Sequence, residues 1–200
     1  MKRLIFDVST HLMYIGYSRR DEINDFSIRI AKRDHAKYLV DRIDQLLKRN
    51  RVTIDDIEAI IVGAGPGSYT GIRVAVMVAK MLAYTKDIPL YGVSSLFLLT
   101  SGYEERVAAM IDARRGNVFS AVHDGTDILL EDGLRPFAEL MNDPVYQSSK
   151  AVFIDENNYE IDLQSVLKRA TRITDVHGFV PNYLRETEAE RKNDEKGVKT

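Results

Sequence analysis

The first thirty residues alternate short apolar runs with polar turns, which is typical of consecutive strands. Residues 4–8 form an apolar run expected of a buried strand, and residues 12–17 form a second after the polar turn Ser9-Thr10-His11. Residues 23–30 alternate apolar and polar side chains, although Asn24-Asp25 could bulge or interrupt that strand. The pattern predicts an antiparallel meander of three strands ahead of any helix.

From residue 34 the apolar spacing changes to that of a helix, with Asp34 as its N-cap and Asn50 near its end. The apolar positions of this helix are Ala36, Leu39, Val40, Ile43, Leu46 and Leu47. The pattern then predicts a buried strand at 58–62, a second helix at about 71–84, a strand at 89–93 and a helix at 95–100.

Three antiparallel strands followed by alternating helices and strands is the order of a ribonuclease H-like mixed sheet of five strands, so the fold class is α/β. Beyond residue 103 the expected strands are short and separated by charged turns, which indicates a smaller second α/β lobe. We therefore expect a first lobe at 1–102, a second at 103–185 whose end could pack back on the first, and a loose, highly charged tail at 186–200.

Composition narrows the possible functions. Twenty-eight basic and 30 acidic residues give a net charge of −2, so any contact with nucleic acid has to be local or made through another subunit. The absence of cysteine excludes disulfides and cysteine-bound metals. The opening apolar run ends at Asp7 and no stretch reaches the ~20 apolar residues of a membrane span, so we expect a cytoplasmic protein without membrane contact.

The strongest local motif is the loop Gly65-Pro66-Gly67-Ser68-Tyr69-Thr70-Gly71-Ile72-Arg73, between the strand at 58–62 and the second helix. Its glycines permit positive φ, and its backbone amides could converge on an anion. It lacks the lysine of a Walker loop and the spacing of a dinucleotide fingerprint. The alternative is a tight strand-to-helix turn without a ligand.

This loop resembles the GPGS(F/Y)TG(I/L)R motif of the TsaB (YeaZ) family. Four further segments resemble motifs of that family in the same order, and the region from Gly125 to His177 contributes little. They are Ile5-Phe6-Asp7-Val8-Ser9-Thr10, Gly92-Val93-Ser94-Ser95-Leu96, Ile111-Asp112-Ala113-Arg114-Arg115-Gly116-Asn117-Val118-Phe119 and Pro181-Asn182-Tyr183-Leu184-Arg185.

The resemblance implies a fold of the superfamily of acetate kinase, sugar kinases, Hsp70 and actin (ASKHA). It also implies a place beside a catalytic paralogue, TsaD, and an ATPase, TsaE. In that system TsaD transfers threonylcarbamoyl to the adenosine 3′ of the anticodon, in tRNAs that read codons starting with A. A TsaB-like chain would be a non-catalytic scaffold that meets tRNA through the complex, while ATP and metal belong to the partner subunits.

The superfamily resemblance also bears on candidate chemistry. Asp7, Ser9 and Thr10 are placed like an acid and hydroxyls that meet magnesium and phosphate in superfamily kinases, and Gly65, Gly67 and Ser68 would complete such a loop. This admits a small ATP-dependent phosphotransferase as the alternative function. We favour a degenerate phosphate loop, because the chain has only about half of the second lobe that closes the kinase cleft.

A metallopeptidase is a further alternative. The catalytic paralogue carries two metal-binding histidines one helical turn apart, whereas here His35 is followed four residues later by Leu39. We therefore expect no metal site.

The second helix is apolar nearly all round, with only Arg73 and Lys80 charged between residues 72 and 84. Such a helix is either sunk in the core or covered by a partner. In the resembled family the first two helices form the seam with the paralogue, so we expect a heterodimer there and a homodimer when the chain is isolated. The expected interface residues are His35, Leu39, Ile43, Arg73, Val76, Met77, Lys80 and Met81.

Overall fold

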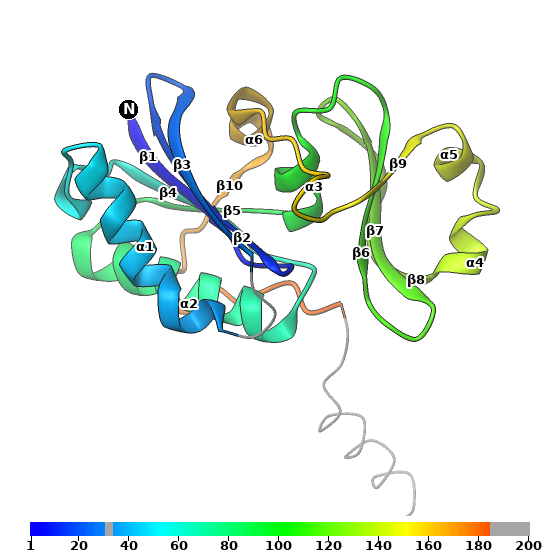
Figure 1. Cartoon of the computed structure of the whole chain (residues 1–200), viewed down its shortest axis with the longest axis horizontal. Coiled ribbons are helices and arrows are strands. Elements are labelled where there is room, and N and C mark those ends of the chain that lie inside the picture. The colour runs from blue at the N-terminus through cyan, green and yellow to red at the C-terminus, as the bar shows by residue number, and fades with distance from the viewer. Residues whose placement is uncertain (31–33, 185–200) are drawn as a thin grey trace, which may run out of the picture.

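The computed structural model describes residues 1–30 and 34–184, which form two sheets side by side (Figure 1). In the first sheet β1 (Lys2–Asp7), β2 (Leu12–Arg19) and β3 (Glu22–Ile30) pair antiparallel, while β4 (Ala59–Gly63) and β5 (Leu90–Val93) run parallel to β1. This order confirms the ribonuclease H-like prediction. A sixth strand, β10 (Thr171–Arg172), pairs antiparallel with β5 and was not predicted.

The interruption expected in the third strand is a bulge. Tyr17 faces Asp25 and Ser18 faces Ile23, so Asn24 is an extra residue on β3. An extra residue changes which face the following side chains occupy. Here Phe26 and Ile28 lie beside Gly16 and Tyr14 of β2, with Phe26 stacked on the Tyr14 ring.

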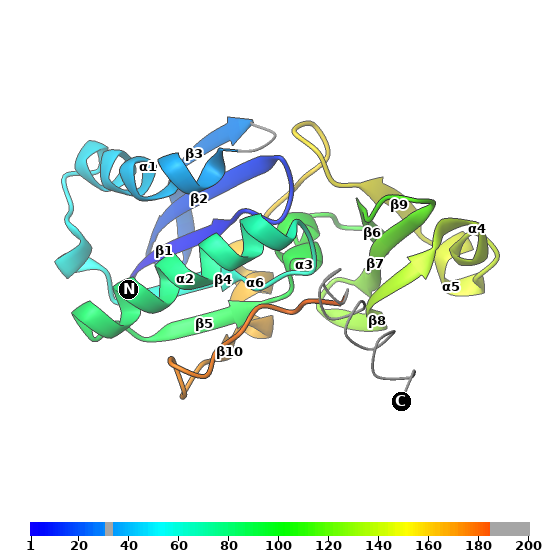
Figure 2. The same cartoon turned by 90° about the horizontal axis from the view of Figure 1, so that it is seen from below.

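Two helices, α1 (His35–Arg49) and α2 (Tyr69–Lys86), cover one face of this sheet (Figure 2). Asp34 and Asn50 flank α1 as predicted, and α2 begins two residues earlier than predicted, behind the N-cap Ser68. Both helices bury their apolar sides against the strands because apolar residues recur at helical spacing. A short 3-10 helix, η1 (Ile54–Asp56), connects α1 to β4.

The other face of the first sheet packs against α3 (Ser95–Thr100) and the second lobe (Figure 1). That lobe is a sheet of order β8-β7-β6-β9, with β6 (Val107–Asp112), β7 (Asn117–Asp124), β8 (Asp127–Pro136) and β9 (Lys150–Phe153). Two one-turn helices, α4 (Phe137–Leu140) and α5 (Pro144–Gln147), lie at its outer side. Since α3 is buried throughout and its residues 96–99 belong to a core cluster that includes residues of both sheets, the lobes share one core.

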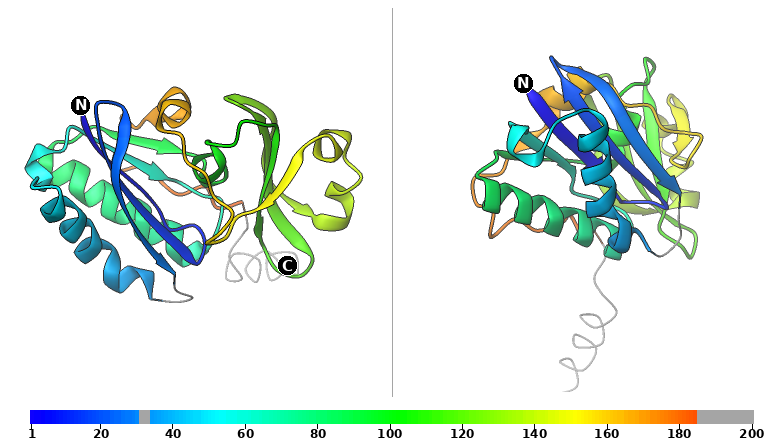
Figure 3. Two further views of the ribbon diagram at one scale, coloured as in Figure 1. Left: turned by 45° about the horizontal axis from the view of Figure 1, so that its top comes forward. Right: turned by 60° about the vertical axis from the view of Figure 1, so that its left-hand side comes forward.

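After β9 the chain returns to the first lobe. The helix α6 (Leu163–Arg169) contacts the β2–β3 turn, where Gln164 Nε2 donates a 2.9 Å hydrogen bond to the Asp21 carbonyl. Strand β10 then joins β5, and residues 173–184 pass along α2 (Figure 3). The part of the chain from α6 onward therefore packs on the first lobe, and the tail expected at 186–200 lies outside the described residues. No helix among those described is long and apolar enough to cross a membrane.

Candidate functional sites at the glycine loop and on helix α2

The turn after β1 is organised by Asp7. Its Oδ1 accepts hydrogen bonds from the Ser9 amide at 2.7 Å and from Ser9 Oγ at 2.6 Å. The carboxyl is fully buried. Burial raises the pKa of Asp7, whereas the hydrogen bonds from Ser9 and Ser95 lower it by a smaller amount. In the same turn Thr10 Oγ1 accepts from the Leu12 amide at 3.0 Å. The hydroxyls predicted to meet phosphate are thus bound within their own turn.

The glycine loop lies directly on that turn. The Ser68 amide donates to the Ser9 carbonyl at 2.6 Å, and Gly67 packs so closely on Ser9 that a Cβ atom would overlap it. Gly65 has φ near +100°, a conformation that favours glycine. Its amide donates to Ser95 Oγ at 2.9 Å and its carbonyl accepts from the Ser95 amide at 2.8 Å. The loop is therefore fixed between Ser9 and Ser95.

The structure brings these candidate residues together, and most of their polar groups bind one another, although the buried Asp7 Oδ2 has no hydrogen-bond partner among the described residues. The amides of Ala64, Gly65, Ser68 and Gly71 have partners within the protein, whereas those of Gly67, Tyr69 and Thr70 have none among the described residues. An anion-binding loop needs free amides that converge on one point. The loop is a tight strand-to-helix junction in which Gly67 closes the space over Ser9, and three amides at the start of α2 remain without a partner among the described residues.

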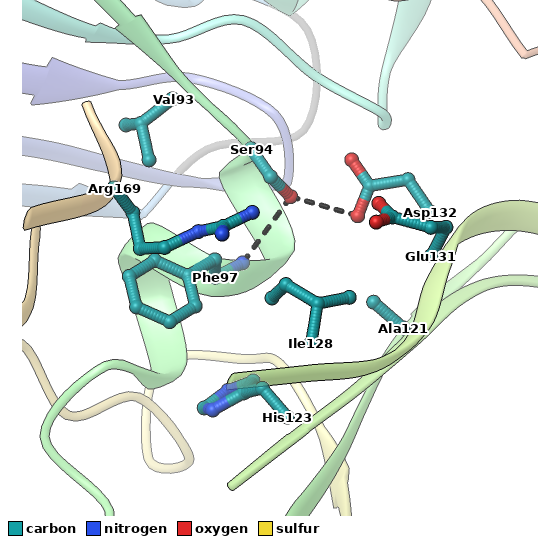
Figure 4. A pocket seen from close by; sticks show the side chains of 9 residues that line it. All are labelled: Val93, Ser94, Phe97, Ala121, His123, Ile128, Glu131, Asp132 and Arg169. Carbon is teal, nitrogen blue, oxygen red and sulfur yellow. Dashed lines mark hydrogen bonds between the residues drawn. The ribbon is translucent and has the colours of Figure 1, made fainter. Parts of the chain in front are cut away.

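A small pocket lies between the lobes (Figure 4). It lies beside the first turn of α3, with Ser94, Asp132 and Arg169 around it, and its volume is about 60 Å³. Small-molecule sites usually enclose several hundred Å³. A nucleotide does not fit this space.

His35, predicted as an interface residue, is 8% exposed at the start of α1 and so is buried in the chain rather than open to a partner. Neither ring nitrogen has a hydrogen-bond partner among the described residues. Burial lowers its pKa, partly opposed by the backbone of His11. Leu39, one turn later, is fully buried in the core. No group of three or more potential metal ligands occurs within residues 1–30 and 34–184.

Helix α2 is not buried on all sides, and the side chains on its solvent-exposed face are mostly apolar or aromatic. The exposed side chains Tyr69, Arg73, Met77, Met81 and Tyr84 follow one another at intervals of three or four residues, and so form one stripe. Met77 is 59% exposed and Tyr84 is 66% exposed. We call these five residues the α2 stripe. On α1, Val40 is the large apolar side chain that is exposed, at 48%.

Several predicted interface residues take other positions. Leu39, Ile43 and Val76 are buried in the chain's own core, so a partner cannot touch them. Lys80 binds the chain instead, because its Nζ donates to the carbonyls of His177 at 2.7 Å and Phe179 at 2.9 Å. Of the predicted set, Arg73, Met77 and Met81 are exposed.

Tyr69, Tyr84 and Val40 were missed as surface residues. The predicted start of the helix excluded Tyr69, and Val40 was counted with the apolar side of α1. The spacing 69, 73, 77, 81 and 84 was the available signal in the sequence.

Comparisons with known proteins bear on this arrangement. The family model of TsaD, tRNA N6-adenosine threonylcarbamoyltransferase, matches residues 28–165. The tRNA threonylcarbamoyladenosine biosynthesis protein TsaB of Bacillus subtilis is 30% identical, over 96% of this chain and 97% of its own length.

Two solved structures are also similar. YeaZ from Pseudomonas aeruginosa is 29% identical with a TM-score of 0.61, over 68% of this chain and 66% of that one. A protein described as similar to peptidase YEAZ from Pseudomonas aeruginosa supports the fold, with 24% identity and a TM-score of 0.73 over 92% of this chain and 99% of its own. With a relative at 30% identity over nearly its whole length, the chain belongs to the TsaB (YeaZ) family.

Proposed function

We propose that this protein is a non-catalytic scaffold subunit in the biosynthesis of threonylcarbamoyladenosine in tRNA. It would hold a catalytic TsaD-type paralogue through the α2 stripe, and the TsaE-type ATPase would join the complex. The Bacillus subtilis relative is named for this biosynthesis, which supports the assignment of the pathway.

The observation that carries the proposal is the composition of the α2 stripe. Two methionines, two tyrosines and an arginine are exposed together on one face of an 18-residue helix. Tyrosine, methionine and arginine are enriched at protein interfaces, and methionine adapts its shape to a partner. A contiguous apolar face of this kind marks an interaction site.

The state of the glycine loop supports the absence of catalysis. Asp7 and Ser9 are bound to each other, and Gly67 fills the space above Ser9. The pocket beside α3 is too small for a nucleotide. Calorimetry of the isolated chain with magnesium and ATP should therefore give no binding heat, and tight stoichiometric binding would favour the phosphotransferase alternative.

The scaffold function is tested with Met77→Glu and Met81→Glu, which place a charge in the middle of the stripe. Association with the TsaD-type paralogue of the same organism, followed by analytical ultracentrifugation, should weaken at least about tenfold, since a desolvated charge without a partner costs more than about 1.4 kcal/mol. Threonylcarbamoyl transfer by the reconstituted complex should fall in parallel.

Leu129→Glu is the matched control. Leu129 is 41% exposed on β8 of the second lobe and lies outside the stripe. It should leave association unchanged. Folded Met77→Glu and Met81→Glu proteins that associate like the parent chain would show that the stripe is not the interface. The self-association expected of the isolated chain should weaken in the same two variants.

A further inference from the structure

A second surface feature lies on the face of the first sheet opposite α1 and α2. A groove of about 600 Å³ runs between β3 and the loop that joins β9 to α6, with Tyr14, Phe26, Glu156, Asn157, Tyr159 and Glu160 among its lining residues. Figure 2 shows this loop next to the end of β3 and on the side away from α2. The groove is thus separate from the α2 stripe.

The walls of the groove are aromatic. The rings of Tyr14 and Phe26 are nearly parallel, with centroids 6.2 Å apart, and the Tyr159 ring is tilted against Tyr14 at 6.3 Å. Phe26 is 51% exposed, so much of this ring faces solvent. Aromatic ring faces attract cations, more strongly where water is partly excluded.

The rim of the groove is acidic. Glu156 and Glu160 both line it, and no lysine or arginine does so among the described residues. Glu156 accepts a 2.6 Å hydrogen bond from His11, whereas Glu160 forms no ion pair within the described chain. Lys150 interacts with Glu160 only at long range, because its ammonium group forms an ion pair with Glu105 at 2.5 Å. The free carboxylate of Glu160 thus favours a cation from outside.

The edge of the sheet beside the groove is partly covered by the chain itself. Strand β3 is the last strand of its sheet, but Arg49 of α1 donates to the Phe26 carbonyl at 2.9 Å and Arg42 donates to the Ile28 carbonyl at 3.4 Å. The Phe26 amide donates to Asp25 Oδ1 at 2.9 Å. The backbone beside Phe26 is therefore not open to an added strand, and the groove can recognise a cationic side chain through its aromatic wall and acidic rim.

We propose that this groove binds the side chain of an arginine or lysine of a partner protein, with the cation between the Phe26 ring and the Glu160 carboxylate. This site is independent of the α2 stripe, because the two lie on opposite faces of the sheet.

The test uses the full chain and an acetylated, amidated octapeptide that alternates arginine with serine. Its binding is measured by calorimetry at constant ionic strength, beside the same peptide with citrulline in place of arginine. Phe26→Ser and Glu160→Gln should each weaken binding about three- to tenfold, the range expected for a cation over an aromatic ring or beside a carboxylate. The citrulline peptide should bind at least tenfold more weakly than the arginine peptide.

Leu134→Ser, at a 37% exposed apolar position on β8, is the control and should bind the peptide like the parent chain. Equal binding of the arginine and citrulline peptides, or unchanged binding by folded Phe26→Ser and Glu160→Gln, would overturn the proposal. Spermidine, a free polyamine, tests whether the site prefers a protein side chain to any cation. Spermidine binding as tight as that of the arginine peptide would overturn the assignment of the groove to a partner protein.

Discussion

Ser94 Oγ donates a 2.9 Å hydrogen bond to Asp132 Oδ1, and this bond joins the two lobes (Figure 4). Ser94 is the N-cap of α3, where its hydroxyl also accepts from the Phe97 amide at 3.3 Å, and Asp132 belongs to β8 of the second lobe. The carboxyl is therefore held half-buried between the two lobes.

Asp132 should make stability fall as the pH rises. Burial, opposed by the Ser94 hydrogen bond and assisted by Glu131, raises the pKa of Asp132 from 3.8 to about 6. The folded state then keeps a proton that the unfolded state loses. The stabilisation is complete below pH 4 and is lost as the pH rises through 6.

Asp132→Asn removes the loss of stability at high pH, because asparagine does not ionise, and its amide oxygen still accepts the hydrogen bond from Ser94. We expect a variant more stable than the parent by about 1–2 kcal/mol at pH 7.5, after allowing for partial solvent screening, and by much less at pH 4.5. Urea unfolding at the two pH values measures this difference. An equal effect at both values would contradict the raised pKa.

His35, at the start of α1, should make the free energy of unfolding rise with pH, which is opposite to the effect of Asp132. Burial lowers the pKa of His35, so the unfolded chain takes up its proton more readily than the folded one. This contribution to stability is complete above the ordinary histidine pKa of about 6.5 and is lost as the pH falls below it. Arg29 lowers the pKa further, whereas Asp34 opposes the shift.

In His35→Gln the slope of unfolding free energy against pH below 6.5 should decrease by up to about 1.4 kcal/mol per pH unit. Burial also lowers the pKa of His123 and therefore leaves a residual slope in this variant. A series of urea unfolding curves between pH 5 and pH 7.5 gives the slope. An unchanged slope would mean that His35 is solvated in the folded state.

The sequence predicted the elements that have a strong local period. Helix α1 lies between Asp34 and Asn50 as expected, because its apolar side repeats regularly. The Asp34 carboxylate binds Arg29 and makes no cap hydrogen bond. The approach of the Gly65 loop to Ser9 was also predictable, since both follow adjacent parallel strands and the carboxyl ends of such strands share an edge.

Other features depend on contacts distant in sequence. Strand β10 has two residues and therefore no period to detect. Whether Met77 or Val76 faces outward depends on which side of α2 meets the sheet, and both are apolar. The partners of Lys80 are carbonyls nearly one hundred positions later, which no local pattern indicates. These contacts explain why part of the predicted interface was misplaced.

Lys80 should hold the end of the chain against α2. Its two hydrogen bonds fix the backbone at His177 and Phe179, and Tyr84 packs edge-on against His177 with ring centroids 4.6 Å apart. In Lys80→Met the amides of residues 176–182 should exchange hydrogen for deuterium faster, with a loss of about 1.5–3 kcal/mol of stability, the usual contribution of hydrogen bonds to a charged group. Lys86→Met, which removes the exposed pair with Asp55, is the control and should leave that exchange unchanged.

The contact of Gly67 with Ser9 should make this position intolerant of a side chain. Gly67→Ala places a methyl group on the Ser9 backbone, which has to shift, and we expect a loss of more than about 3 kcal/mol of stability. Gly116→Ala is the matched control, because Gly116 has φ near +73° and open space around it. It should lose only about 1–2 kcal/mol, the usual penalty for an ordinary residue in the left-handed region.

Neighbouring residues on α2 should respond oppositely to the same substitution. Val76 is 2% exposed and packed in the core, whereas Met77 is 59% exposed. Val76→Glu buries a charge without a partner and should lower stability by more than about 4 kcal/mol, while Met77→Glu should change it by less than about 0.5 kcal/mol. Thermal unfolding of the isolated chains, at a concentration where they do not self-associate, measures both. A large loss in Met77→Glu would mean that the stripe contributes to folding itself, and lost association in that variant would then say nothing about a partner.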